Sequence, residues 1–317
     1  MIKNILKKII KFYVNKENRS IKKIINENFN SNFKMLDIGA AGDINKRWSI
    51  IKDKISIFLV EPHPESANEL KQKGVKVIER FLYEEEGKNI KFYQTKKKTN
   101  SGFLKPNLVH LKKFPDLERY NIEETVDVST STLDNEIKKM NVKNLDFVKI
   151  DTEGSELNIL KGSKNTLKNV LGLEIECNFF HLREDSPLFE DIRNYLKNYG
   201  IIFVDFLNII RWEMNNYKSL IGQPQFADVL FLKDPSIVLS NFKNNLINEN
   251  TLLNYLIVLT IYYRSDMLDF MVNNLEKNFV EERNLDQLNN LVKKKNKRLN
   301  NIFKISDHFR NSLLGKH

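Results

Sequence analysis

Cysteine is almost absent from this chain, and its scarcity limits both chemistry and location. Cys177 is the only cysteine in 317 residues, so the chain can form no internal disulfide and no cysteine-based zinc site. A chain without a disulfide framework is typical of a reducing compartment. We therefore expect this protein in the cytoplasm.

Long apolar runs are also missing. The longest apolar stretch, LLNYLIVLTIYY at residues 252–263, is interrupted by Asn254 and falls short of the roughly 20 residues that a membrane-spanning helix needs. The basic N-terminus, MIKNILKKIIKFYVNK, lacks the uninterrupted apolar core of a signal peptide. We expect a soluble or membrane-peripheral protein, and the 41% of hydrophobic residues is enough to build a sizeable core.

The formal net charge of +10 lies entirely in the two ends of the chain. Residues 1–33 carry a net charge of +6 and residues 236–317 carry +4, which leaves residues 34–235 neutral. An enzyme that acts on nucleic acid usually has basic residues around the groove that holds its substrate. The neutral middle segment therefore disfavours a nucleic-acid partner.

From residue 34 onward, short apolar runs alternate with polar, helix-like segments. Parallel βαβ units produce this alternation, so we predict a doubly wound, mostly parallel α/β sheet over residues 34–235. The expected strands are KMLDI (34–38), ISIFLV (55–60), VKVI (75–78), LDFVKI (145–150), LGLEIE (171–176), IIFVDF (201–206) and FADVLFL (226–232). Residues 88–135 interrupt the rhythm with a further strand, NIKFYQT, and a polar stretch at 96–107. Such an insertion is either a substrate loop or a surface loop without a role.

Two helical extensions flank the sheet segment. In residues 1–33, a basic and amphipathic extension, the apolar residues between 2 and 14 follow helical spacing with lysines between them. Residues 236–317 are expected to be helical, with segments at 250–263, at 266–279 and from 285 onward. The core, a partner subunit or an anionic membrane can cover such apolar faces. Homo-oligomerisation and peripheral contact with the inner membrane face therefore both stay open.

The first strand leads into a glycine-containing loop flanked by carboxylates. Gly39 and Gly42 allow a tight turn and a close approach of a ligand to the backbone. Asp37 precedes them, and Asp43 follows and can also cap the next helix. The second strand ends at Glu61, where an acidic side chain is placed to accept hydrogen bonds from ribose hydroxyls. Carboxylates here would repel a pyrophosphate but suit a sulfonium and an ammonium, so we predict S-adenosylmethionine as the cofactor.

A second acidic block follows the strand LDFVKI. This strand delivers Asp151 to the carboxyl edge of the sheet, and Glu153 lies in the next turn. Glu174 and Glu176 alternate with apolar residues on the following strand, so they either reach the same edge or pair with nearby basic residues. His181 comes just after that strand and is either catalytic or structural. All five are candidates for the group that accepts a proton during the reaction.

Four strings together resemble the FkbM family of methyltransferases: EPHP (61–64), STSTLD (129–134), LDFVKIDTEGSELNILKG (145–162) and LEIE (173–176). The resemblance covers about residues 34–234, and KIDTEG is its most specific part. It implies the class I methyltransferase (Rossmann-like) fold, with an antiparallel last strand. It also implies S-adenosylmethionine-dependent O-methylation of a sugar, a surface glycan or a secondary metabolite.

The resemblance further implies roles for single residues at the cofactor site. They are Asp37, Gly39 and Gly42 at the methionine end, Glu61 at the ribose, Phe81 and Leu82 near the adenine, and Asp151 beside the methyl group. An alcohol also has to lose its proton as the methyl group is transferred. Either one of the five candidate side chains removes it, or Asp151 and Glu153 hold a divalent cation that activates the hydroxyl.

Three other functions compete with this interpretation. Methylation of nitrogen or RNA is disfavoured by the neutral middle segment and by the lack of an [ND]PP[YF] tetrapeptide. A nucleotide-sugar oxidoreductase is disfavoured by the sequence GAAG with Asp43 beside it. A non-catalytic adapter would not need Asp37, Glu61 and Asp151, all of which are present.

Overall fold

The computed structural model describes residues 17–30, 32–39, 46–72, 74–214 and 222–297. The chain forms two compact units. The helical unit comprises residues 1–32, 44–55 and 235–317, and the sheet unit comprises residues 33–43 and 56–234. The chain therefore leaves the sheet unit after its first strand and returns to it at the second.

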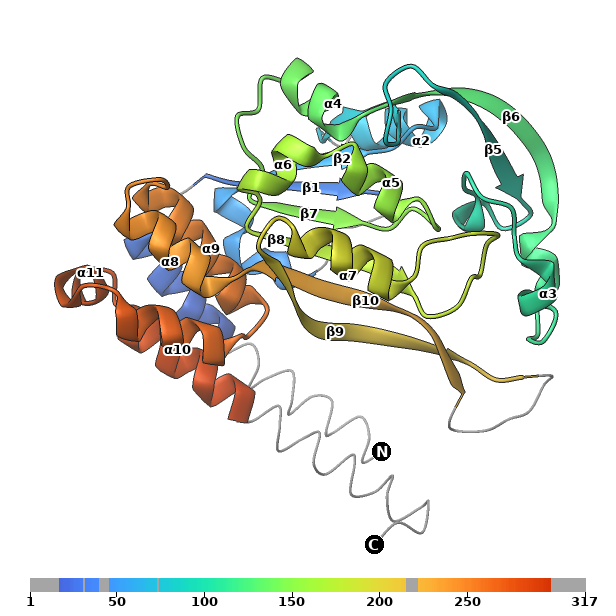
Figure 1. Cartoon of the computed structure of the whole chain (residues 1–317). Helices are drawn as coiled ribbons and strands as arrows, with labels where there is room; N and C mark the ends of the chain where they lie inside the picture. Colours follow the sequence, from blue (N-terminus) through green and yellow to red (C-terminus); the bar gives the residue numbers. More distant parts are fainter. Residues whose placement is uncertain (1–16, 31, 40–45, 73, 215–221, 298–317) are drawn as a thin grey trace, which may run out of the picture. The chain divides into compact units, whose positions relative to one another are not determined.

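A seven-stranded sheet is the centre of the sheet unit (Figure 1). Its strands are β1 (Phe33–Ile38), β2 (Ile55–Val60), β3 (Lys76–Ile78), β7 (Phe147–Ile150), β8 (Gly172–Asn178), β9 (Ile201–Trp212) and β10 (Gln223–Lys233). Their order is β3-β2-β1-β7-β8-β10-β9. The pairs β2–β3, β1–β7 and β7–β8 are parallel, whereas β10 is antiparallel to β8 and β9. The predicted mostly parallel sheet with an antiparallel last strand is confirmed.

The helices of the sheet unit are α2 (Pro64–Gln72), α4 (Leu133–Lys139), α5 (Glu156–Lys161), α6 (Lys164–Asn169) and α7 (Phe189–Lys197), with the short α3 in the insertion. In Figure 1, α5, α6 and α7 lie in front of the strands. Leu36, Val148 and Ile175, on three neighbouring strands, are at most 1% exposed and belong to one apolar core. Strands that are buried on both faces have nearly continuous apolar sequences, which is why the sequence predicted their positions.

The insertion forms a small second sheet beside the carboxyl ends of the strands. The insertion supplies β5 (Asn89–Thr95) and β6 (Ile122–Ser131), and the preceding β4 (Phe81–Leu82) pairs with β6, so that the order is β4-β6-β5. The predicted strand NIKFYQT is confirmed as β5. The segment between β5 and β6 contains η2 (Lys98–Asn100), α3 (Leu108–Leu111) and η3 (Leu117–Tyr120). Glu184 N–H donates to the Lys105 carbonyl at 2.8 Å and Asn107 N–H to that of Leu182 at 3.0 Å, so the insertion is bonded to the loop after β8.

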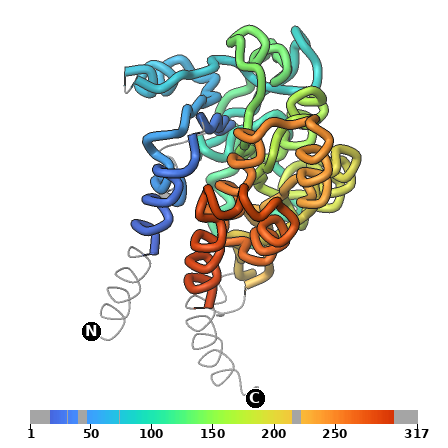
Figure 2. The backbone as a smooth tube through the Cα atoms, turned by 90° about the vertical axis from the view of Figure 1, so that its left-hand side faces the viewer, coloured from blue at the N-terminus to red at the C-terminus, as the bar shows by residue number. Residues whose placement is uncertain are grey.

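The helical unit contains η1 (Lys46–Lys54), α8 (Pro235–Lys243), α9 (Glu249–Ile261), α10 (Ser265–Asn274), α11 (Lys277–Glu282) and helical segments at residues 17–28 and 285–297. The segment 17–28 lies antiparallel to the last one, because Asn18 accepts a hydrogen bond from Lys295 and Asn28 accepts one from Asn284 (Figure 2). The α9 helix is apolar nearly all round and is buried from Leu252 to Ile261. The helical character of the C-terminal extension is confirmed over residues 236–297.

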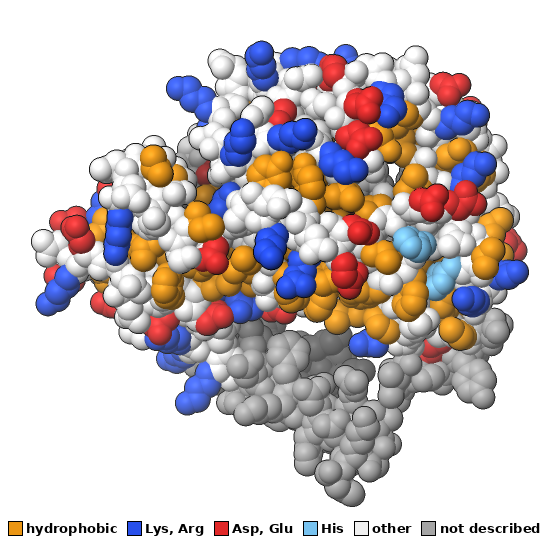
Figure 3. Space-filling model, in the orientation of Figure 1, with side chains coloured by type: hydrophobic (Ala, Val, Ile, Leu, Met, Phe, Trp, Pro, Cys, Tyr) orange, Lys and Arg blue, Asp and Glu red, His pale blue; other side chains and the backbone are white. Residues whose placement is uncertain are grey.

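Some sequence predictions fall outside the described residues, namely the amphipathic helix at residues 2–14, Gly42 and Asp43. Within the described ranges, no helix combines the length and apolar character that crossing a bilayer requires. On the face shown in Figure 3, the basic and acidic side chains of the described residues are interspersed. This mixture fits the absence of net charge in residues 34–235.

Candidate active site

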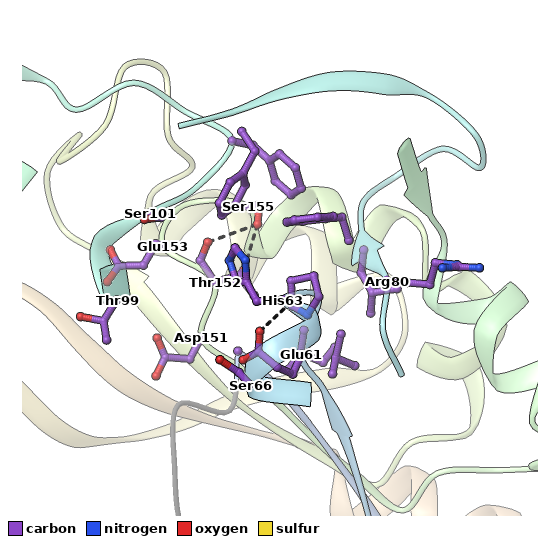
Figure 4. Close-up of a pocket in the computed structure, with 18 of the residues that line it drawn as sticks. Glu61, His63, Ser66, Arg80, Thr99, Ser101, Asp151, Thr152, Glu153 and Ser155 are labelled. Atoms are coloured by element: carbon purple, nitrogen blue, oxygen red, sulfur yellow. Dashed lines mark hydrogen bonds between the residues drawn. The ribbon is translucent and has the colours of Figure 1, made fainter. Parts of the chain in front are cut away.

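A cavity of about 620 Å³ opens at the carboxyl ends of β1, β2 and β7 (Figure 4). Open α/β sheets bind their ligands at this edge, and the volume is within the range of small-molecule sites. Glu61, Asp151 and Glu153 line it from the sheet side, and Thr99 and Ser101 line it from the insertion. The insertion is therefore part of the cavity wall.

Gly39 brings the end of β1 against the end of β7. Its φ is +84°, and a Cβ built on it would lie 1.8 Å from the carbonyl oxygen of Asp151. Asp151 N–H in turn donates to the Ile38 carbonyl at 3.0 Å. Only glycine fits a position that combines a left-handed backbone with so close an approach. The two loops that flank the cavity are therefore fixed to each other.

Glu61 lies just beyond β2, and its backbone holds it there. Its N–H donates to the Ile78 carbonyl at 3.1 Å, which continues the pairing with β3. The carboxylate oxygen Oε1 accepts the His63 N–H at 2.9 Å, so the side chain is bonded to its own turn while it lines the cavity. A carboxylate fixed in this way is a preorganised acceptor for hydroxyl groups.

Lys149 lies among the carboxylates at the end of the central strands. Its Nζ is 3.0 Å from Asp151 Oδ2 and 3.7 Å from Asp37 Oδ1. Burial by itself lowers the pKa of Lys149, but Asp151 and Asp37 together raise it above its usual value. Burial raises the pKa of Asp37, and Lys149 opposes that shift. The ammonium of Lys149 thus offsets part of the negative charge of Asp37 and Asp151 at this edge of the sheet.

The turn after β7 is held by buried side chains. Glu156, which is 1% exposed, accepts the N–H groups of Thr152 at 2.9 Å and Gly154 at 3.1 Å. Glu153 has a φ of +58°, and its Oε2 is 2.5 Å from Nη2 of Arg183. The same Arg183 nitrogen donates to the Asn100 carbonyl at 2.7 Å. Arg183 therefore connects the KIDTEG turn to the insertion.

Glu176, on β8, is a further carboxyl group on the cavity wall. It pairs in register with Asp228 on β10. Burial raises the pKa of Glu176 well above its usual value, and the negative charges of Glu153 and Asp151 raise it further. A carboxyl group with a raised pKa in a cavity is a candidate for acid–base chemistry.

Four aromatic rings form the opposite wall. Phe81, Phe92 and Phe103 lie with ring centroids 4.9 to 5.9 Å apart, and His63 is 5.7 Å from Phe92 and 5.9 Å from Phe81. All four line the cavity. Tilted and edge-on contacts of this kind leave ring surfaces that can receive a flat heterocycle.

The structure brings seven of the predicted site residues to the cavity wall: Gly39, Glu61, Phe81, Leu82, Asp151, Glu153 and Glu176. Asp37 and Glu174 are buried beside it, at 7% and 5% exposure, and are not among the described lining residues. His181 is not brought to the cavity, and its Nδ1 lies 2.7 Å from the Ser186 carbonyl oxygen. Gly42 lies outside the described residues. The functional roles of all eleven stay predictions.

Sequence reasoning missed four parts of this site. Phe92 and Phe103 come from the insertion, Lys149 belongs to a buried strand, and Arg183 follows β8. The lysine within the otherwise apolar strand FVKI was a usable signal, because an isolated charge in a core strand needs a partner. The pairing of Arg183 with Glu153 spans 30 residues and has no local sequence signal.

Within the described residues, no group of three or more His, Cys, Asp or Glu is arranged to hold a metal ion.

Replacing Gly39 by Ala should lower the free energy of unfolding of the sheet unit by at least about 1–3 kcal/mol, the usual cost of a strained backbone conformation. The clash with the Asp151 carbonyl adds to that cost. Gly74→Ala is the matched control, since Gly74 has a φ of +79° but open space around its Cβ position. Urea unfolding of both variants measures the difference. Equal losses in the two would contradict the close approach at Gly39.

Comparison with known proteins places this site in a family. The family profile described as the methyltransferase FkbM domain matches residues 37–203. That range begins near the end of β1 and contains β2, β7 and all described residues of the cavity wall. No curated protein sequence matches the chain.

Two of the solved structures that are similar to this chain are methyltransferases, and both have a low sequence identity to it. Magnesium protoporphyrin IX methyltransferase from Synechocystis PCC 6803 has 7% sequence identity and a TM-score of 0.34, with 69% of this chain and 79% of that chain covered. Precorrin-6y C5,15-methyltransferase from Geobacter metallireducens has 13% identity and a TM-score of 0.34, with 68% and 87% covered.

Proposed function

This chain belongs to the FkbM family of methyltransferases, and on that premise we propose that it transfers a methyl group from S-adenosylmethionine to a hydroxyl group of a sugar, a surface glycan or a secondary metabolite. The observation that carries the proposal is the acidic, aromatic-walled cavity at the ends of β1, β2 and β7. Two properties of this cavity fit the cofactor.

First, the carboxylates fit the charges of the cofactor. Asp37 Oδ1 is buried, 3.7 Å from the Lys149 ammonium, and accepts no hydrogen bond from the described residues. Such an acceptor is suited to the ammonium of the methionine moiety. Asp151 adds negative charge on the cavity wall where a sulfonium would be bound. A pyrophosphate would meet these same carboxylates unfavourably, which disfavours a dinucleotide.

Second, the remaining walls fit a nucleoside. Glu61, bonded to the His63 N–H, is placed to accept hydrogen bonds from ribose hydroxyls. Phe81, Phe92 and Phe103 form an apolar surface for an adenine ring. Together with Gly39, these residues would hold the cofactor from both ends.

When bound, S-adenosylmethionine supplies a methyl group already activated on a positively charged sulfur. The protein then has to align the acceptor hydroxyl, exclude water and receive the hydroxyl proton. Thr99 and Ser101 of the insertion border the cavity and are placed to contact the acceptor. The carboxyl groups of Asp151, Glu153 and Glu176 line the cavity and are candidates to receive that proton.

Titration calorimetry with S-adenosylmethionine, S-adenosylhomocysteine and NAD⁺ tests the cofactor. Binding of the first two without NAD⁺ supports the proposal, whereas binding of NAD⁺ alone would support an oxidoreductase and overturn it. Methyl-labelled cofactor is then incubated with neutral sugars, nucleotide sugars, amines and tRNA. Label on a sugar hydroxyl is the expected result, and label on an amine or on tRNA would replace the O-methylation proposal with the corresponding alternative.

A further inference from the structure

We infer that Glu176 is the proton acceptor of this site, that it is protonated in the free protein, and that it ionises when the positive charge of the methyl donor is bound. This inference rests on the proposed cofactor. It assigns to one side chain the step that the sequence left open among five residues and a metal ion. The argument rests on the register of the sheet, the position of Arg183 and the acidic surroundings of Glu176.

The sheet register places Glu176 on the acidic face of the cavity. Lys149 on β7 pairs with Glu174 on β8, and side chains two residues apart on a strand share a face. Asp151 and Glu176, two residues further along, therefore extend from the same face, and both line the cavity. Asp228 stands opposite Glu176 on β10 and continues the row away from β7.

Charged and titratable groups surround Glu176 from every neighbouring element. The groups that interact with it are Asp151 and Glu153 in the turn after β7, Glu156 on α5, Asp228 on β10 and Tyr120 on η3. Two cations, Lys149 on β7 and Arg183 after β8, are paired with carboxylates of this group. Lys149 contacts Asp151 and Asp37, and Arg183 contacts Glu153. The negative charges of the carboxylates thus act on Glu176, which forms no salt bridge with the described residues.

Arg183 decides which member of the pair Glu153 and Glu176 carries the proton. Burial raises the pKa of Glu153, but the guanidinium 2.5 Å from its Oε2 opposes the shift and favours the ionised form. At Glu176 the largest contributions come from burial and from the neighbouring carboxylates, and all of them raise its pKa. The proton shared by two adjacent carboxyl groups therefore resides on Glu176.

A cation that enters the cavity favours the ionised form of Glu176 instead of the protonated form. The positive sulfur offsets the negative charge of Asp151 and Glu153, so the pKa of Glu176 falls and its proton passes to solvent. In the transfer, the S–CH₃ bond breaks with its electron pair left on sulfur, and an O–CH₃ bond forms. The O–H bond breaks with its electrons left on oxygen, and the proton goes to the Glu176 carboxylate. With the sulfur neutral again, Glu176 is restored to its protonated state.

Proton release on ligand binding tests this inference without an acceptor substrate. S-adenosylmethionine and S-adenosylhomocysteine differ in the charge on sulfur, so calorimetry in buffers of different ionisation enthalpy isolates the effect of that charge. We expect the charged ligand to release up to about one more proton than the neutral one, at a pH above the usual pKa of a glutamate side chain. In Glu176→Gln the extra release should disappear at every pH.

Two further variants show whether the released proton comes from Glu176 or from another carboxyl group. In Glu153→Gln, loss of the neighbouring negative charge should move the extra release to lower pH without abolishing it, because Glu176 then ionises more readily. Glu190→Gln makes the same change on the exposed side of α7 and should behave like the wild type. Equal release by the two ligands in the wild type, or extra release that persists in Glu176→Gln and vanishes in Glu153→Gln, would overturn the inference. Failure of both ligands to bind would instead overturn the cofactor proposal.

Discussion

Replacing Asp151 by Asn should lower the rate of methyl transfer by about 100-fold or more, the usual scale for losing a preorganised charge at a reacting centre. Asn keeps the shape and an oxygen acceptor for Lys149 Nζ, now 3.0 Å from Asp151 Oδ2. It removes the negative charge, however, so that the positive charge of Lys149 faces a positively charged methyl donor. Both turnover and affinity for S-adenosylmethionine should therefore fall, while affinity for S-adenosylhomocysteine falls less.

Initial rates with labelled cofactor measure this effect once an acceptor has been identified. Asp127→Asn, an equivalent change on the exposed strand β6, is the matched control. A native rate in Asp151→Asn would remove Asp151 from the reaction. Repeating the wild-type assay with a chelator separates the two mechanisms, since a cation held by Asp151 and Glu153 would make activity sensitive to it.

Replacing Glu61 by Ala should weaken binding of both the cofactor and its demethylated product. Two hydrogen bonds to a charged acceptor contribute about 2–4 kcal/mol, which corresponds to about 30- to 700-fold in the dissociation constant. The loss should be the same for the two ligands, because Glu61 is placed to contact the ribose that they share. Titration calorimetry measures both constants.

Glu61 also accepts the His63 N–H at 2.9 Å, so alanine removes a bond of the turn as well as a ligand contact. Glu61→Gln keeps an oxygen for that N–H and removes only the charge, which separates the two effects. Glu65→Ala, on the exposed first turn of α2, controls for a general loss of acidic side chains in this region. Wild-type affinity in Glu61→Ala with an intact circular dichroism spectrum would exclude the ribose contact.

The part of the site that the sequence made predictable comes from the ends of parallel strands. Strands buried on both faces give unmistakable apolar runs, and parallel strands deliver the residues that follow them to one edge. Gly39, Glu61 and Asp151 each follow such a run directly, and the structure brings all three to one cavity. The same logic extends to Glu176 on β8.

The rest of the cavity wall depends on packing between segments that are distant in the sequence, and the pattern of apolar and polar residues does not predict such packing. Phe92 and Phe103 face the cavity because the small sheet of the insertion folds over it. Arg183 meets Glu153 through the backbone contacts that bind the insertion to the loop after β8. His181 follows the same strand as Glu176, but its ring nitrogen lies against the Ser186 carbonyl instead of lining the cavity.

The excursion of the chain at residues 44–55 limits how this protein can be shortened or recombined. Within the helical unit, Ile51 on η1 is fully buried and Trp48 contacts Tyr262 just after α9, with ring centroids 6.0 Å apart. Cutting the chain at residue 235 would therefore expose apolar side chains in the connection between β1 and β2. Because the helical unit is assembled from three separate stretches of sequence, neither a gene fusion nor a single crossover could transfer it intact to another methyltransferase.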